Sequence, residues 1–270
     1  MFTWLVACGH PEPASVDPCD DRGDRSLYVV QSLWFARGAG GVSEGFDLDG
    51  VDGPAGGCAV SDWVAPDGAA GIDNAFASLL PALELTEAAA VEGLIQTAIA
   101  SGELLITVEL SEVDDPADDA CVDLAIGRAL GPPILGTDGK VLSGSTFDPD
   151  PEIDPVVATD VPLAEGVFEM PVELSLPLQI FDVSLQFELL DGRFRGVMQP
   201  DGTLTGVFAG GVDTQAILAV TEEENVDSGL HDVVQALLDA WADLAPDGAG
   251  GCGQISMAFT FTAVPAFWYR

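Results

Sequence analysis

A run of alternating apolar residues over positions 167–190 constrains the fold more than any other stretch of the sequence. Apolar side chains occupy the even positions up to Ile180 and the odd positions after it. A period of two is typical of a β-strand with one buried face. Because a shift of one residue would turn the apolar side chains to the opposite face, we expect a bulge or tight bend after Ile180. Pro171 and Pro177, on the polar phase, favour a strand at a sheet edge.

Similar patterns predict further strands elsewhere in the chain. Residues 26–36 carry apolar side chains on both faces, which indicates a strand covered on both sides. Turn residues at Asp191-Gly192 and at positions 200–202 separate short strands, which is typical of an antiparallel meander. The predicted strands besides the run at 167–190 are 26–36, 103–110, 121–126, 193–198, 203–212 and 255–263.

Two segments have the apolar spacing of amphipathic helices. The first runs from Thr86 as N-cap to about Ser101, with Gly102 as its stop, and the second covers residues 228–244. Residues 131–160, rich in Pro, Gly and Asp, predict a long surface excursion. Residues 26–270 therefore predict a single α+β domain with a mainly antiparallel sheet of about eight strands and two to four amphipathic helices.

The charge balance excludes several classes of partner. The chain has 45 acidic and 8 basic residues, a formal charge of −37, so electrostatic binding to nucleic acid or to an anionic membrane surface is not expected. The hydrophobic content of 48% contradicts disorder, the usual state of so acidic a chain. The acidic residues must therefore lie on a folded surface, where they are either solvated or bound to cations.

The acidic residues are densest in a glycine-rich segment, 44–74, which has seven carboxylates and no Lys or Arg. Calcium takes six to eight oxygen ligands, and glycines let backbone carbonyls turn toward the ion. The Asp-x-Asp-Gly run and the Ile-Asp-Asn ending resemble the calcium loops of thrombospondin type 3 repeats. That resemblance implies a structural calcium site with ligands Asp47, Asp49, Asp52, Asp67, Asp73 and Asn74. An EF-hand does not fit, because its twelfth position would be Cys58 instead of Glu. The alternative is a set of solvated Asx and glycine turns.

A second acidic cluster covers residues 109–123, and it is a weaker candidate for a cation site. Acidic runs are usually solvated faces of a protein. Its loop aspartates are Asp114, Asp115, Asp118 and Asp119.

The N-terminus resembles a bacterial lipoprotein. Leu5-Val6-Ala7-Cys8 is similar to a lipobox, whose cysteine is lipidated, and residues 9–25 predict a flexible tether. Gly9 after the cysteine implies sorting to the outer membrane, with the domain facing the periplasm or the cell surface. Only seven residues precede Cys8, so residues 1–8 would be the end of an incomplete signal sequence. The alternative is an accidental match and an unpaired thiol.

With Cys8 lipidated, four cysteines remain, an even set that suits two disulfides in an oxidising compartment. They are Cys19, Cys58, Cys121 and Cys252. Three pairings exist, and we favour Cys58 with Cys121 because both lie beside acidic loops. With no CxxC pair and only two histidines, a zinc or iron–sulfur site is not expected.

Signals for catalysis are weak. Residues 41–45 match GxSxG, with His231 later in the chain, but a glycine-rich loop follows Ser43 where the nucleophile elbow needs a helix. A glycosidase needs only two acids, so finding a pair among 45 carries little information. We therefore expect a structural or binding role without catalysis, with a protein or a glycan as partner. The alternative is a calcium-dependent secreted hydrolase or lyase acting on envelope polysaccharide, which would need a cleft with convergent carboxylates and tryptophans.

Overall fold

The computed structural model describes residues 23–53, 58, 60–84, 90–180, 183–222, 228–248 and 250–269. Cys8, Cys19 and the predicted N-cap Thr86 lie outside these residues. The described chain forms one sheet-rich domain with four helices, which agrees with the predicted α+β class. The strands are β1 (Asp24–Phe35), β2 (Leu105–Val113), β3 (Asp119–Leu130), β4 (Ser145–Pro149), β5 (Val156–Leu163), β6 (Val167–Ile180), β7 (Val183–Met198), β8 (Leu204–Asp213), β9 (Leu244–Pro246) and β10 (Cys252–Trp268). The helices are α1 (Phe76–Leu83), α2 (Val91–Ser101), α3 (Thr214–Glu222) and α4 (Ser228–Trp241).

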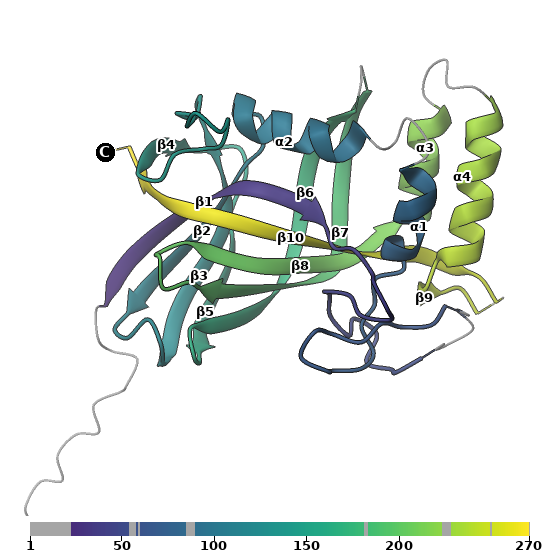
Figure 1. Cartoon of the computed structure of the whole chain (residues 1–270), viewed down its shortest axis with the longest axis horizontal. Helices are drawn as coiled ribbons and strands as arrows, with labels where there is room; N and C mark the ends of the chain where they lie inside the picture. Colours follow the sequence, from purple (N-terminus) through teal and green to yellow (C-terminus); the bar gives the residue numbers. More distant parts are fainter. Residues whose placement is uncertain are drawn as a thin grey trace, which may run out of the picture.

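The strands make one mainly antiparallel sheet in the order β1-β2-β3-β4-β10-β8-β7-β6, with β5 on β3 and β9 on β10. β1 also pairs with β10, so β1, β2, β3, β4 and β10 form a closed circuit (Figure 1). The described residues contain ten strands, more than the eight or so predicted. The predicted surface excursion at 131–160 is wrong in part, because it contains β4 and the start of β5. Short strands in Pro- and Asp-rich sequence have too few alternating positions to show a period.

β10, with 17 residues, is the central strand of the fold. Its residues 259–266 pair with β1 along one edge, and its residues 254–263 pair with β8 along the other. Phe259 of β10 is fully buried, and its ring lies 4.8 Å from that of Phe35 and 5.2 Å from that of Phe208. β1 is buried on both faces from Leu27 to Val30, as its pattern predicted. These aromatic and aliphatic side chains from distant parts of the chain form the main core.

The long alternating segment forms the β6–β7 hairpin. Ile180 pairs with Val183, so the change of apolar phase coincides with the reversal of the chain. β6 is the last strand of the sheet, which confirms the edge position that its prolines favoured. The predicted turn at Asp191-Gly192 is wrong: β7 continues through it with a bulge, Asp191 has a φ of 48°, and the register shifts beside it. A Cβ on Gly192 would lie 2.7 Å from the Val172 carbonyl oxygen, so only glycine fits between the neighbouring strands.

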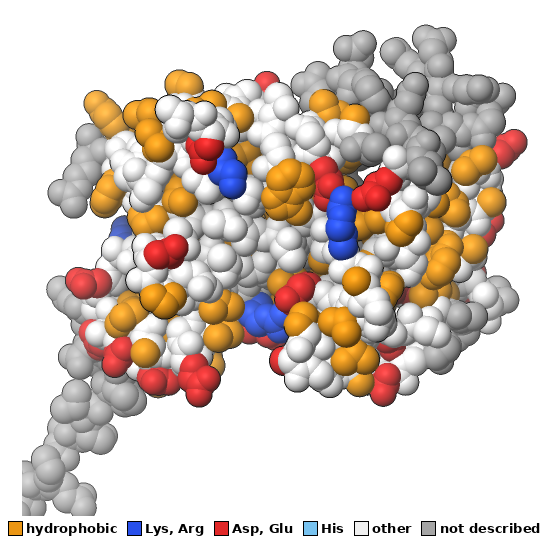
Figure 2. Space-filling view, in the orientation of Figure 1, with side chains coloured by type: hydrophobic (Ala, Val, Ile, Leu, Met, Phe, Trp, Pro, Cys, Tyr) orange, Lys and Arg blue, Asp and Glu red, His pale blue; other side chains and the backbone are white. Residues whose placement is uncertain are grey.

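The helices lie along one side of the sheet, with α2 across β1 and β6 and with α1, α3 and α4 grouped beyond it (Figure 1). Helix α2 buries Ile95, Ala98 and Ile99 and ends at Gly102, the predicted stop, with a φ of 86°. In helix α4, Val234, Leu237 and Trp241 pack against the main core and Leu238 is buried, whereas Val233 is exposed. Within the described residues, none of the helices has the length and apolar character needed to cross a membrane. Acidic side chains are scattered over the visible surface, whereas basic ones occur at few places (Figure 2).

Candidate metal centre

The acidic segment forms the loops between β1 and α1, which lie beside β9 and below the helices in Figure 1. Phe46 anchors these loops, because its buried side chain packs against Val207, Ala209 and Ala258 on the face of the sheet opposite the main core. The guanidinium groups of Arg193 and Arg195 lie 5.4 and 5.2 Å from the centre of the Phe46 ring. Arg195 also pairs with Glu44 at 3.2 Å. Both arginines therefore hold the Phe46 ring at the edge of the loops, and Arg195 neutralises the first of the acids.

Asp73 is the buried carboxylate at the centre of the segment, with 2% of its surface exposed. Its Oδ2 accepts hydrogen bonds from the backbone N–H of Leu48 at 2.6 Å and of Asp49 at 3.2 Å. Its own N–H donates to the Phe46 carbonyl at 2.9 Å. Burial, together with the nearby carboxylates of Asp49 and Asp243, raises the pKa of Asp73 to about 7 against the opposing effect of the hydrogen bonds.

Asp47, Asp49 and Asp73 converge: one carboxylate oxygen from each lies within 4.8 Å of the others. The turn that brings them together is local, because Asp47 accepts from the Gly50 N–H at 2.7 Å and Asp49 from the Val51 N–H at 2.9 Å. A Cβ on Gly71 would lie 3.4 Å from the Val51 carbonyl oxygen and 3.5 Å from the Asp47 carboxyl carbon. These are ordinary van der Waals distances, and what favours glycine here is its φ of 77°, which glycine adopts without strain.

This cluster can hold a metal ion, and its donors suit a hard cation. Every candidate ligand is an oxygen, from three carboxylates with the Val51 carbonyl nearby. Among the described residues, none of the six ion pairs involves Asp47, Asp49 or Asp73. A divalent cation would supply the counter-charge that the described basic side chains do not.

The other three predicted ligands are not among the three carboxylates that converge, and each makes contacts of its own in the loops. Asp52 contributes to the field that raises the pKa of Asp62. Asp67 is exposed and accepts from the Ala69 N–H at 3.0 Å, in the kind of Asx turn that the alternative predicted. The buried Asn74 amide donates to Ser43 Oγ at 2.9 Å and to the carbonyls of Ala36 and Glu44 at 3.2 Å. Asn74 thus ties the loop to the end of β1.

Sequence reasoning missed two acids, Asp62 and Asp243. Asp62 Oδ2 accepts from the Gly53 N–H, and burial followed by the charges of Asp49, Asp52 and Asp47 raises its pKa. Asp243 follows α4, accepts from the Ser256 N–H at 2.7 Å and from the Ser256 hydroxyl, and is buried with it. Neither residue lies in a glycine–aspartate run like that of the first loop. Their position near the cluster therefore follows only from contacts made in the folded structure.

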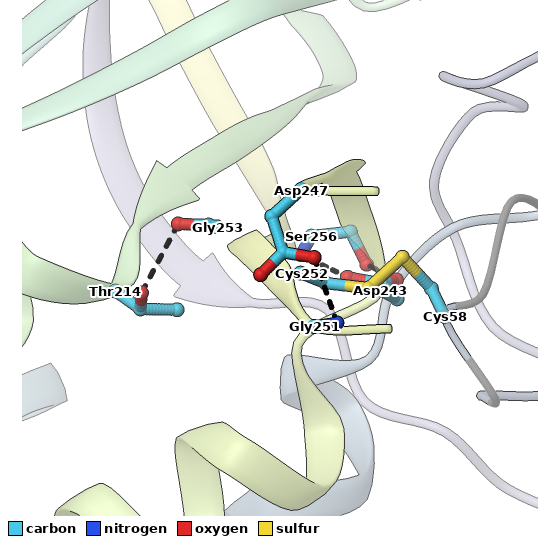
Figure 3. The surroundings of a disulfide bond; sticks show 8 residues. All are labelled: Cys58, Thr214, Asp243, Asp247, Gly251, Cys252, Gly253 and Ser256. Carbon is cyan, nitrogen blue, oxygen red and sulfur yellow. Dashed lines mark hydrogen bonds between the residues drawn. A yellow bond between two sulfur atoms is a disulfide. The ribbon is translucent and has the colours of Figure 1, made fainter. Parts of the chain in front are cut away.

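A disulfide fixes the acidic loops to the central strand. Cys58 pairs with Cys252, across 194 residues of sequence, so the predicted pairing of Cys58 with Cys121 is wrong (Figure 3). Cys121 is itself disulfide-bonded. The acidic clusters that suggested the Cys58–Cys121 pair lie apart, since the second one is at the β2–β3 turn (Figure 1). The N–H of Ala75 donates to Ser256 Oγ at 2.7 Å, which adds a polar link between the same two segments.

The second acidic cluster and the GxSxG match both serve local structure. Asp119 accepts backbone N–H bonds from Asp114 and Cys121, which lower its pKa. The Ser43 hydroxyl donates to the Glu44 carbonyl at 3.1 Å and accepts from Asn74, and a loop follows it where an elbow would have a helix. These polar groups are engaged with backbone or with the loop itself.

Asp243 predicts a specific pH dependence of stability. Burial raises its pKa to about 6, so between pH 4 and 6 the folded protein holds a proton that the unfolded chain has released. This bound proton stabilises the folded protein at low pH, and the stabilisation is lost as the pH rises through 6. In chelator, the melting temperature of Asp243→Asn should fall less over this range than that of the wild type.

Calorimetry from pH 4 to 7 measures this difference. The exposed acid Asp239, changed to Asn, is the matched control and should follow the wild type. Equal slopes for Asp243→Asn and the wild type would refute the assignment.

Comparisons of this chain with protein families, with curated proteins and with solved structures found no match.

Proposed function

We propose that this chain is a cell-envelope lipoprotein, anchored in the outer membrane through Cys8, whose domain is stabilised by calcium and has a structural or binding role without catalysis. The observation that carries the calcium part is the convergence of Asp47 and Asp49 on the buried Asp73. A carboxylate buried beside two others is unfavourable without a counter-charge, and a bound cation removes that cost.

Calcium is the ion that the donor set favours. Three carboxylates and a nearby carbonyl are hard oxygen donors, which disfavours zinc and copper. Calcium accepts irregular geometry with many protein oxygens, whereas magnesium demands a near-ideal octahedron and keeps several waters. In this proposal Asp47, Asp49 and Asp73 bind the ion directly. Asp62 lies near enough to Asp47 and Asp49 for their charges to raise its pKa, and it is a further candidate ligand. Stabilisation of the protein by calcium, measured against chelator, tests this assignment.

The alternative was a hydrolase or lyase acting on envelope polysaccharide, which needs free carboxylates in a cleft. A pocket on the outside of β2 and β3 is lined by Glu109, Asp150 and Trp268. Glu109 is already engaged by Arg25 at 2.7 Å and by the Trp268 indole at 2.6 Å. Asp150 lies beside Arg128. Carboxylates held in this way are poorly placed to transfer protons, so we favour the non-catalytic role.

The anchor predicts the state of the cysteines in protein isolated from a bacterial envelope. If Cys8 is lipidated, mass spectrometry should find diacylglycerol on Cys8 as the mature N-terminus, with residues 1–7 removed. The pairing of Cys58 with Cys252 then leaves Cys19 as the partner of Cys121, and peptide mapping should recover that bond. An intact Met1, or a Cys8–Cys121 peptide, would refute the anchor and leave the calcium site untouched.

A further inference from the structure

An apolar patch is exposed at the end of the sheet where β4 and the end of β10 lie, far from the acidic loops (Figure 1). It consists of Ile134, Leu135, Leu142, Phe267 and Tyr269. Three of these side chains are more than half exposed, namely Tyr269 at 72%, Ile134 at 64% and Phe267 at 61%. Figure 2 shows hydrophobic side chains gathered over this end of the molecule. A group of exposed apolar side chains marks a contact site for a protein or a membrane, whereas single ones are normal.

The patch is formed by two segments that hydrogen-bond to each other. The Leu142 N–H donates to the Ile134 carbonyl at 2.8 Å, which closes the loop before β4. Two residues later, the Gly144 N–H donates to the Pro265 carbonyl at 2.7 Å, and β10 then pairs with β4 through Phe267. The loop and the end of β10 are therefore held together as one surface.

The patch is nearly free of charge in a chain of −37. Residues 131–144 contain one acid and one base, Asp138 and Lys140, and residues 252–269 contain neither. The exposed Asp148 of β4 lies at the border of the patch. A second copy of the chain is a poor occupant, because two chains of −37 repel each other, and anionic lipid is repelled for the same reason. A neutral lipid surface carries no such penalty.

The start of β1, which leads back along the chain to Cys8, lies at the same end of the domain (Figure 1). The Glu109 carboxylate joins the two strand ends, because it pairs with Arg25 at 2.7 Å and accepts from the Trp268 indole N–H at 2.6 Å. Trp268 stands between the two aromatic residues of the patch in the sequence. Arg25 is seventeen positions after Cys8, so the chain between them spans no more than about 60 Å. A domain anchored at Cys8 therefore keeps this end within reach of the membrane.

We infer that the patch docks on the surface of a neutral lipid bilayer, an inference whose choice of partner rests on the proposed anchor at Cys8. Aromatic side chains with a polar end, such as that of Tyr269, are enriched at the boundary between lipid and water. Lys140 can lay its apolar stem along the surface and keep its ammonium group in water. Because the anchor keeps the local concentration of lipid high, weak contact is enough to orient the domain. In this orientation the acidic loops and helices α3 and α4 point away from the membrane (Figure 1).

Sedimentation with phosphatidylcholine vesicles tests the inference on the mature chain from position 8, made with Cys8→Ser so that no lipid is attached. We expect the protein to sediment with the vesicles at millimolar lipid, and less so as phosphatidylglycerol is added, because of its charge of −37. Ile134→Ser combined with Phe267→Ser should weaken binding about tenfold or more, since two exposed apolar side chains are lost. Val42→Ser combined with Val233→Ser, at two exposed valines outside the patch, is the matched control and should bind as the wild type does.

Two results would overturn the docking surface. If the wild type does not sediment with neutral vesicles, the inference is wrong, and analytical ultracentrifugation then shows whether the patch joins two copies of the chain instead. Equal sedimentation of the wild type and of the double patch variant would place binding elsewhere. Melting curves confirm that each variant folds, and if the double variant does not, Ile134→Ser alone decides the outcome.

Failure of the anchor is distinguished from failure of the docking surface, because the two have different readouts. A mature Cys8 without diacylglycerol would refute the anchor and leave the vesicle binding of the unlipidated chain as it is. The absence of vesicle binding would refute the docking surface and leave the mass of the N-terminus as it is.

Discussion

Calcium is expected to raise the melting temperature of this protein by about 5 to 10 °C over its value in chelator. An ion that binds only the folded state stabilises it by about 2.7 kcal/mol at a hundred times its Kd. Here the ion would also relieve the repulsion among Asp47, Asp49 and Asp73, which lie within 4.8 Å of one another. Differential scanning calorimetry in millimolar calcium and in chelator measures the shift.

Substitutions at the cluster separate a bound ion from general screening of charge. Asp47→Asn combined with Asp49→Asn should abolish the calcium shift and raise the melting temperature in chelator, because the repulsion is gone. Asp67→Asn removes an exposed acid from the same loops and should keep the full shift. If the melting temperature of the wild type is the same with calcium and with chelator, the loops are solvated turns and the calcium assignment is wrong.

Removing the Cys58–Cys252 disulfide is expected to lower stability by about 3 to 5 kcal/mol, since the bond closes a very long loop. The two cysteines are 194 residues apart in the sequence. Cys58→Ala combined with Cys252→Ala should therefore lower the melting temperature by about 10 °C. Alanine suits the buried Cys58 position, and changing both residues leaves no new free thiol.

The disulfide and the metal cluster should contribute independently. The backbone bond between the Asp73 N–H and the Phe46 carbonyl holds the cluster together without Cys58. The double alanine variant should thus keep its calcium shift while melting at a lower temperature. A melting temperature within about 2 °C of the wild type would show that Ser256 and Phe46 anchor the loops without help from the disulfide, because so small a change is about 1 kcal/mol.

The long alternating segment shows how much of the structure the local pattern of residues can predict. Its period of two predicted strands correctly on both sides of Ile180, since each side chain responds to the face on which it lies. At Asp191-Gly192 the same two residue types serve a hairpin turn and a bulge equally well. The structure has the bulge, because β8 continues to pair with β7 on the far side of it and the carbonyls of Val172 and Ala209 approach Gly192.

The candidate metal site, likewise, could be predicted from the sequence only in part. Asp47 and Asp49 are two residues apart in a glycine turn, and Asp73 belongs to the second loop of the same resemblance, so sequence reasoning could find all three. Asp62 and Asp243 were missed because their proximity to the cluster follows from loop pairing and from the packing of β10. Asp67, in an equally glycine-rich context, remains a surface turn.

Periodicity and residue type therefore account for the strands, for the main helices, for the acidic loops and for the oxygen chemistry of their donors, since these depend on neighbours within a few residues. The convergence of the carboxylates depends on how two loops of the same segment pair with each other. The pairing of Cys58 with Cys252 and the pocket lined by Glu109 and Trp268 depend on contacts between segments more than a hundred residues apart in the chain. The local pattern of residues along the chain carries no information about such contacts. They arise because β10 pairs with β1 and β8 at once, which brings the two halves of the chain onto a single strand.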